Sequence, residues 1–278
     1  MQNYAFTQDN IRLNRVVHTE DAELNWLFFP GGPGGDSSIL NGLIEAIDVP
    51  GNITLVDLPG NGTHAVEQPY DYDQWLELFI PFIKSVKNPV FVGHSFGGML
   101  PLLFSELEDL LVGCVIMNTT PGLWLEEAAR LAMENKLPDL TEDMAAFNAN
   151  PSQETFEQAI QACMPYYFPK ETLAKGAEIL GKVHIVYQAA VWWQHKAIEM
   201  NYNAQWIPQS VETLIIGGEY DYITPYSMFA KDERFERENI TKTCITGAGH
   251  APWVEKPERV KALFSEFAAN LPQRTASF

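Results

Sequence analysis

Short apolar runs alternate with amphipathic segments along most of the chain. The runs have the length of buried strands, and we expect strands over 24–29, 52–56, 89–92, 111–117, 213–216 and 241–245. Helical spacing of apolar residues predicts helices over about 36–47 and 73–86, from about 96 onward, and over about 257–271. Strands that alternate with helices indicate an α/β fold with a mostly parallel sheet flanked by helices.

The stretch 121–206 interrupts this alternation. It carries helical patterns, at 125–136, 152–163, 171–181 and 183–200, and no clear buried strand. We interpret it as a helical cap inserted after a central strand of the sheet. The predicted organisation is therefore a first part of the core at 1–120, a cap at 121–206 and a second part of the core at 207–278.

The pentapeptide Gly93-His94-Ser95-Phe96-Gly97 is the first candidate for chemistry. It directly follows a predicted strand and opens a predicted helix, which is the setting of a nucleophile elbow. The predicted nucleophile is Ser95, and the alternative is a tight glycine turn with an incidental serine. In the helix that follows, Pro101 removes a hydrogen bond to the Gly97 carbonyl and should kink the helix.

A serine hydroxyl is a weak nucleophile unless a base activates it. Of the six histidines, only His250 follows a predicted sheet strand in a loop of small residues. An acid that orients the base is expected between the serine and this histidine, where Glu219 and Asp221 both follow a strand. We prefer Asp221 because it precedes a new helix, although a helix N-cap would stand in the same place. Asp57 comes before the serine and is predicted to stabilise a turn.

The order Ser95, Asp221, His250 resembles that of the α/β-hydrolase superfamily. Within it, the run Pro30-Gly31-Gly32-Pro33-Gly34 resembles the His-Gly-Gly-Pro-Gly loop of the proline iminopeptidases, the peptidase S33 group. This resemblance implies an oxyanion hole formed by the backbone amides of Gly32 and Phe96. It also implies a cofactor-free serine hydrolase that removes an N-terminal residue from short peptides or amides through an acyl-enzyme. A glycine-rich turn without a catalytic role is the alternative for the loop.

Two positions depart from the iminopeptidase pattern. Pro30 stands where that group has histidine, and Tyr222 stands where an acid often follows the catalytic aspartate. The amine of an exopeptidase substrate would then need another acid, such as Glu219, Glu178 or Glu199. A carboxylesterase or lactonase that acts on small apolar esters is therefore the alternative. A further alternative is a homologue that binds a ligand without catalysis.

Three aromatic residues of the predicted cap are candidates for the substrate pocket. We expect Trp192, Trp193 and Tyr166 either to line an apolar pocket or to pack within the cap. Together with Glu219 and Tyr222 they complete the set of residues predicted to bind substrate.

The composition narrows the classes of partner. The formal net charge of −18 disfavours binding to nucleic acid or to an anionic membrane, because both require a basic face. The three cysteines lie far apart without metal-ligand spacing, and no run of apolar residues is long enough to span a bilayer. The first ten residues lack the basic and apolar regions of a secretory signal. We expect a cytoplasmic protein without metal or cofactor that acts on a small-molecule or short-peptide substrate.

Overall fold

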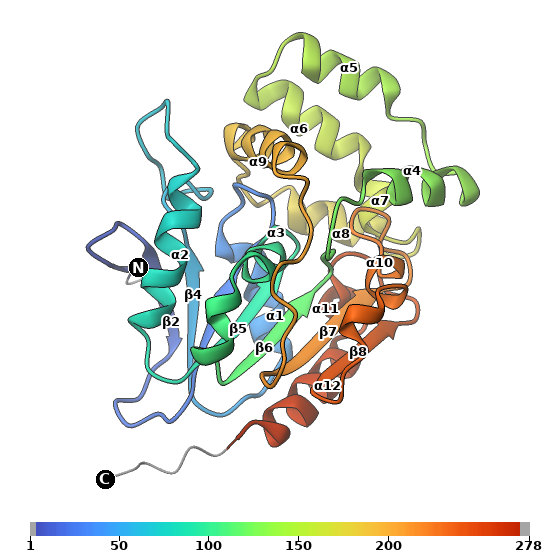
Figure 1. The fold of residues 1–278 in the computed structure, drawn as a ribbon. Helices are drawn as coiled ribbons and strands as arrows, with labels where there is room; N and C mark the ends of the chain where they lie inside the picture. Colours follow the sequence, from blue (N-terminus) through green and yellow to red (C-terminus); the bar gives the residue numbers. More distant parts are fainter. Residues whose placement is uncertain (1–3, 273–278) are drawn as a thin grey trace.

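The computed structural model describes residues 4–272, whose centre is one eight-stranded sheet (Figure 1). The spatial order of the strands is β1-β2-β4-β3-β5-β6-β7-β8. Pairing is antiparallel from β1 to β2 and from β2 to β4, and parallel from β4 to β8. The strands are β1 (Tyr4–Phe6), β2 (Arg12–Val17), β3 (Asn25–Phe29), β4 (Asn52–Asp57), β5 (Pro89–His94), β6 (Gly113–Met117), β7 (Glu212–Gly218) and β8 (Ile240–Ile245). The predicted α/β fold with a mostly parallel sheet is confirmed.

The parallel strands were predicted from their apolar runs, whereas the two N-terminal strands were not. The sequence of β2 is Arg-Leu-Asn-Arg-Val-Val, and its last three residues are exposed. Only Arg12 at its beginning is buried, so β2 carries no continuous apolar run. Its place in the sheet depends on pairing with β4, which a local pattern does not reveal.

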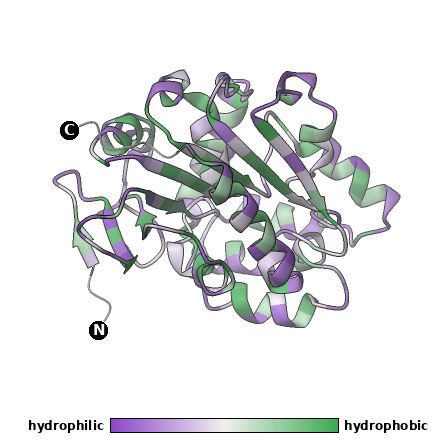
Figure 2. Cartoon of the chain, turned by 90° about the horizontal axis from the view of Figure 1, so that it is seen from below, coloured by the Kyte–Doolittle hydropathy of each residue, from purple (hydrophilic) through white to green (hydrophobic). Residues whose placement is uncertain are grey.

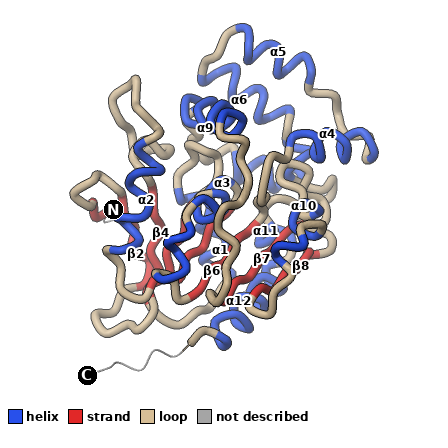
Figure 3. The backbone as a smooth tube through the Cα atoms, viewed as in Figure 1, coloured by secondary structure: helices blue, strands red, loops and turns tan. Residues whose placement is uncertain are grey.

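Helices cover both faces of the sheet (Figures 1 and 3). One face packs against α2 (Gln74–Lys84), α3 (Phe96–Met99) and α10 (Ser227–Ala230). The other face packs against α1 (Asn41–Ala46), α11 (Pro252–Glu255) and α12 (Pro257–Asn270). The central strands supply both cores by alternation, since Phe91 points to the first face while Val90 and Val92 point to the second. Apolar colour is accordingly concentrated on the central strands (Figure 2).

The helix after the predicted elbow is shorter than expected. The sequence predicted one helix with a kink at Pro101, but α3 ends at Met99 and a 3₁₀ turn spans Pro101–Leu103. Proline has no N–H to donate to the Gly97 carbonyl, so the α-helical ladder stops here. The chain from 101 to 109 forms short 3₁₀ turns before β6 begins.

Six helices lie between β6 and β7, over the end of the sheet at which the parallel strands finish (Figure 1). They are α4 (Leu125–Glu134), α5 (Thr141–Ala149), α6 (Gln153–Ala162), α7 (Met164–Tyr167), α8 (Leu173–Leu180) and α9 (Tyr187–Glu199). Four of them follow the helical patterns of the sequence, whereas α5 and α7 were not predicted. The treatment of 121–206 as a separate cap stays a prediction. Within residues 4–272, no helix combines the length and the apolar character needed to cross a membrane.

A buried ion pair fixes the segment after the glycine-rich loop to the sheet. Arg12 donates from Nε and Nη2 to Oδ2 of Asp57, each at 2.9 Å, and both side chains are almost fully buried. The other oxygen of Asp57 accepts the backbone N–H of Ser37 at 2.6 Å. Asp57 thus stabilises more than its own turn, because it ties β2 and β4 to the segment that follows the loop 30–35.

The Arg12→Ala substitution should lower the free energy of unfolding by about 3–5 kcal/mol, because it leaves the buried Asp57 carboxylate without its cation. Urea denaturation of the purified protein measures this loss. The matched control is Arg15→Ala, an exposed arginine on the same strand, for which we expect less than about 0.5 kcal/mol. Equal losses for the two variants would contradict the structural role of the ion pair.

Candidate active site

The predicted site residues come from the ends of neighbouring parallel strands. Ser95 follows β5, Asp221 follows β7 after a short turn, and His250 lies in the loop after β8. Strands β5, β6, β7 and β8 are adjacent and parallel, so their carboxyl ends meet at one edge of the sheet. The structure therefore brings together three residues that are far apart in the sequence.

Ser95 occupies a backbone conformation that few residues adopt. Its φ is 55° and its ψ is −122°, and its N–H donates to the Met117 carbonyl at 2.9 Å. The turn is so tight that a side chain at Gly93 would place its Cβ 2.3 Å from the Gly97 carbonyl oxygen. Such strain persists only where the surrounding structure enforces it, and it is typical of functional sites.

His250 and Asp221 are hydrogen bonded in a buried position. Nδ1 of His250 lies 2.9 Å from Oδ2 of Asp221, and the two side chains are 6% and 0% exposed. A carboxylate partner requires Nδ1 to carry a proton, so Nε2 is the nitrogen available to accept one. Both Ser95 and His250 line the same small cavity.

The carboxylate of Asp221 is held ionised by its neighbours. Burial opposes ionisation of Asp221. The neighbouring His250 and hydrogen bonds from the Thr224 N–H and the Asn118 amide favour it more strongly, so the pKa of Asp221 lies below its usual value. Its Oδ1 accepts the N–H groups of Ile223 and Thr224, each at 3.0 Å. These two bonds resemble those of a helix N-cap. Asp221 therefore makes both the N-cap-like bonds, through Oδ1, and the bond to His250, through Oδ2.

Asn118 is a site residue that the sequence analysis missed. It follows β6 directly, and its Nδ2 donates to Asp221 Oδ2 and to the Gly249 carbonyl, both at 3.0 Å. The backbone carbonyl of Asn118 accepts a hydrogen bond from the Thr224 hydroxyl at 2.7 Å. One side chain thus joins the ends of three strands. The sequence did contain one signal for Asn118: it follows an apolar strand, as the predicted catalytic residues do.

His94 lies beside the predicted base, His250, although it directly precedes Ser95 in the sequence. Its Nε2 bonds the His250 carbonyl oxygen at 2.8 Å, and the two rings lie 4.8 Å apart. Burial and the neighbouring His250 lower the pKa of His94 to about 3. A neutral His94 that donates from Nε2 supports the His250 backbone.

The glycine-rich loop packs directly on Ser95. A side chain at Gly31 would place its Cβ 2.6 Å from the Ser95 Cβ, so this position tolerates only glycine. Gly32 lines the cavity over Ser95. Phe96 opens α3, and the first N–H groups of a helix lack intrahelical acceptors. The positions of Gly32 and Phe96 are compatible with the predicted oxyanion hole, which stays a prediction.

The cavity over Ser95 is small and mostly apolar. Its volume is about 20 Å³, enough for roughly one water molecule. None of the described residues that line it is acidic; they are Gly31, Gly32, Ile39, His94, Ser95, Ile160, Tyr167, Leu180, Ile185 and His250. The polar chemistry of this space is therefore limited to Ser95, the two histidines, Tyr167 and backbone groups.

None of the five residues predicted to bind substrate is among the described residues that line this cavity. Trp192 donates its indole N–H to Asp73 of the core at 2.8 Å, and Trp193 packs on Phe96 with ring centres 4.9 Å apart. The Tyr166 carbonyl accepts the Tyr222 N–H at 3.0 Å. Glu219 is exposed and accepts the Gly247 N–H. A direct role for these five residues in substrate binding stays a prediction.

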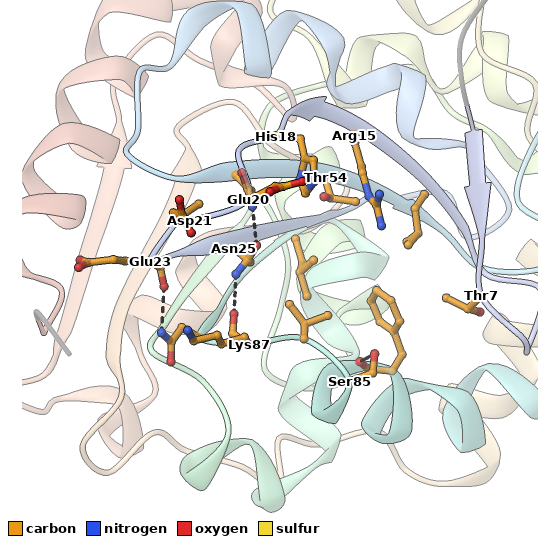
Figure 4. A pocket seen from close by; sticks show the side chains of 17 residues that line it. Thr7, Arg15, His18, Glu20, Asp21, Glu23, Asn25, Thr54, Ser85 and Lys87 are labelled. Atoms are coloured by element: carbon orange, nitrogen blue, oxygen red, sulfur yellow. Dashed lines mark hydrogen bonds between the residues drawn. The ribbon is translucent and has the colours of Figure 1, made fainter. Parts of the chain in front are cut away.

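A larger hollow of about 1000 Å³ lies at the opposite end of the parallel strands. Figure 4 shows the side chains that line it. Its rim carries exposed charged side chains, and Asn25 and Asn88 bond the backbone carbonyls of Lys87 and Glu23 there. The hydroxyl of Ser85 is bonded to the Phe82 carbonyl. Ser95 shares its cavity with a histidine that is bonded to an aspartate, so we place the candidate active site there.

Two named proteins are similar to this chain over most of its length. A protein of Mycoplasma genitalium named "Putative esterase/lipase 1" is 24% identical over 226 residues, which cover 76% of this chain and 80% of that protein. The pimeloyl-[acyl-carrier protein] methyl ester esterase of Wigglesworthia glossinidia brevipalpis is 24% identical over 252 residues, which cover 83% of this chain and 88% of that protein.

The fold is also similar to that of solved structures. The proline iminopeptidase-related protein of Thermus thermophilus superposes with a TM-score of 0.67 at 20% identity, and the match covers 97% of each chain. The model of the alpha/beta hydrolase family matches residues 27–263 of this chain, which include Ser95, Asp221 and His250. The chain therefore belongs to the alpha/beta hydrolase family and is a hydrolase.

Proposed function

We propose that this hydrolase is a carboxylesterase that cleaves esters with an apolar acyl group. The observation that carries the proposal is the cavity over Ser95, whose lining includes four aliphatic side chains and contains no carboxylate among the described residues. An apolar acyl chain gains free energy by entering such a space, whereas a charged amine would lose it. The names of both relatives contain the word esterase, which supports the same class.

In the proposed mechanism, the Ser95 hydroxyl attacks the ester carbonyl while Nε2 of His250 takes its proton. Asp221 keeps the His250 ring in the required tautomer and stabilises the imidazolium. The N–H groups of Gly32 and Phe96 bind the developing oxyanion. The alcohol then leaves with the proton from His250. Water, activated by the same nitrogen, hydrolyses the acyl-enzyme and regenerates Ser95.

The exopeptidase that the glycine-rich loop suggests is the less supported candidate. A free amine next to Ser95 would need a carboxylate partner, because an unpaired buried cation is costly. Of the acids considered for this role, Glu219 is bonded to the Gly247 N–H, and Glu178 is exposed and paired with Lys182. Glu199 is also exposed and lies near Lys196. Likeness to the Thermus thermophilus protein supports the shared fold rather than this substrate.

The test compares nitrophenyl acetate with the free-amine and N-acetyl forms of an amino-acid arylamide. We expect ester hydrolysis, with kcat/KM lowered at least about 1000-fold by Ser95→Ala, because only binding and the oxyanion hole would remain. Neither arylamide should be a good substrate. Efficient cleavage of the free-amine form alone would support the exopeptidase and sink the esterase proposal, and undiminished turnover by Ser95→Ala would refute the mechanism.

We also propose that Asn118 positions Asp221. The Asn118→Gly substitution removes the amide without straining a backbone whose φ is 46°. Loss of a hydrogen bond to a charged group, about 1.5–3 kcal/mol, should lower kcat/KM by roughly 10- to 100-fold. It should also raise the pKa of Asp221, because that bond favours the ionised form. The acid limb of the pH–rate profile would then move to higher pH.

The matched control for this prediction is Asn201→Gly. Asn201 is an exposed asparagine after α9 with a φ of 47°, and its loss should leave both rate and pH profile unchanged. If Asn118→Gly lowered the rate and the stability but left the acid limb in place, Asn118 would be a structural residue only.

A further inference from the structure

A second cavity adjoins the space over Ser95. It measures about 380 Å³ and lies between α6, α8 and the segment that leads to α9. Three side chains line both spaces, namely Ile160, Leu180 and Ile185. These three aliphatic side chains therefore form a common wall between a cavity that holds about one water molecule and a groove of the size that ligands occupy.

The groove is continuous with the apolar wall but polar at its rim. Phe156, Met164 and Val183 extend the apolar lining beyond the common wall. Glu157 and Lys182 line the groove as exposed charged residues. Apolar side chains beside exposed charged ones fit a hydrocarbon chain whose far end reaches water.

The position of the common wall favours the acyl arm of an ester over the alcohol arm. Ile185 forms a β-bridge with Gly35, and the Val186 N–H donates to the Gly34 carbonyl at 3.0 Å, so this segment is fixed to the glycine-rich loop. The alcohol must instead leave past His250, which gives it a proton. That side is covered by Tyr167, whose ring centre lies 5.1 Å from that of His250.

We propose that the groove between α6 and α8 is the acyl-chain subsite, and that Ile160, Leu180 and Ile185 are the gate between it and Ser95. This inference rests on the proposed esterase function. A short acyl group reacts in the inner cavity once these side chains turn aside, and a medium-length chain passes between them into the groove. The gate and the groove together determine which acyl-chain length the enzyme prefers.

The test measures the ratio of kcat/KM for nitrophenyl octanoate to that for nitrophenyl acetate. Gln161 lies on α6, is exposed and lines the groove. The Gln161→Trp substitution should fill the groove and lower the ratio at least about 10-fold, because two or more methylenes then lose their burial. Ile160→Ala removes part of the side chain between the two spaces and should raise the octanoate-to-acetate ratio. The matched control is Gln158→Trp, an exposed glutamine of the same helix outside the groove, which should leave the ratio unchanged.

A second substrate series separates the two arms of the ester. Octyl acetate and ethyl acetate differ only in the alcohol. The ratio of kcat/KM for octyl acetate to that for ethyl acetate should be the same in Gln161→Trp and in wild type. If Gln161→Trp lowered this alcohol ratio and left the octanoate-to-acetate ratio unchanged, the groove would not be the acyl-chain subsite. If acetate hydrolysis required Ser95 but Gln161→Trp left the octanoate-to-acetate ratio unchanged, the assignment of the groove would be wrong while the esterase proposal would stand. Absence of any Ser95-dependent ester hydrolysis would overturn the proposed function, and this inference with it.

Discussion

The ionised carboxylate of Asp221 is the group around which the site is arranged. It is almost wholly removed from water, and an isolated charge in that position would take up a proton. Donors from separate segments prevent this: the Asn118 amide from the end of β6, the N–H groups of its own turn, and the ring of His250. If these segments shifted relative to one another, the proposed base would lose both its orientation and its counter-charge.

The helices over the sheet take part in the same constraint. The Tyr167 carbonyl, at the end of α7, accepts the His250 N–H at 2.7 Å, and the Tyr166 carbonyl accepts the Tyr222 N–H. At the other side of the cavity, the segment before α9 is bonded to the glycine-rich loop. Because α7 holds the acid and base loops while Ile185 holds the loop over Ser95, the helical region contributes to the geometry of the site as well as covering it.

The sequence predicts those parts of this arrangement that depend on local pattern. Apolar runs mark the parallel strands, and the small residues around Ser95 and His250 mark the turns at their ends. Other parts depend on contacts between distant segments. Strand β2 is held by pairing and by the buried Arg12, and Pro101 ends α3 where the pattern suggested a longer helix.

The lining of the cavity over Ser95 also depends on contacts between distant segments. The residues proposed from their aromatic character, Trp192 and Trp193, pack between α9 and the core. The cavity over Ser95 is lined in part by aliphatic residues of α6, α8 and the segment before α9. Nothing in the local sequence distinguishes Ile160, Leu180 or Ile185 from ordinary core residues, since only the packing of the helices over the sheet brings them to Ser95.

The central claim is that Ser95 is a nucleophile activated by His250. Its most direct test is mass spectrometry of the protein after reaction with a fluorophosphonate, which labels serines only when an adjacent base activates them. We expect one phosphonyl adduct on the peptide that contains Ser95, none in Ser95→Ala, and labelling slowed by orders of magnitude in His250→Ala. An adduct on another residue, or equally fast labelling without His250, would contradict the account.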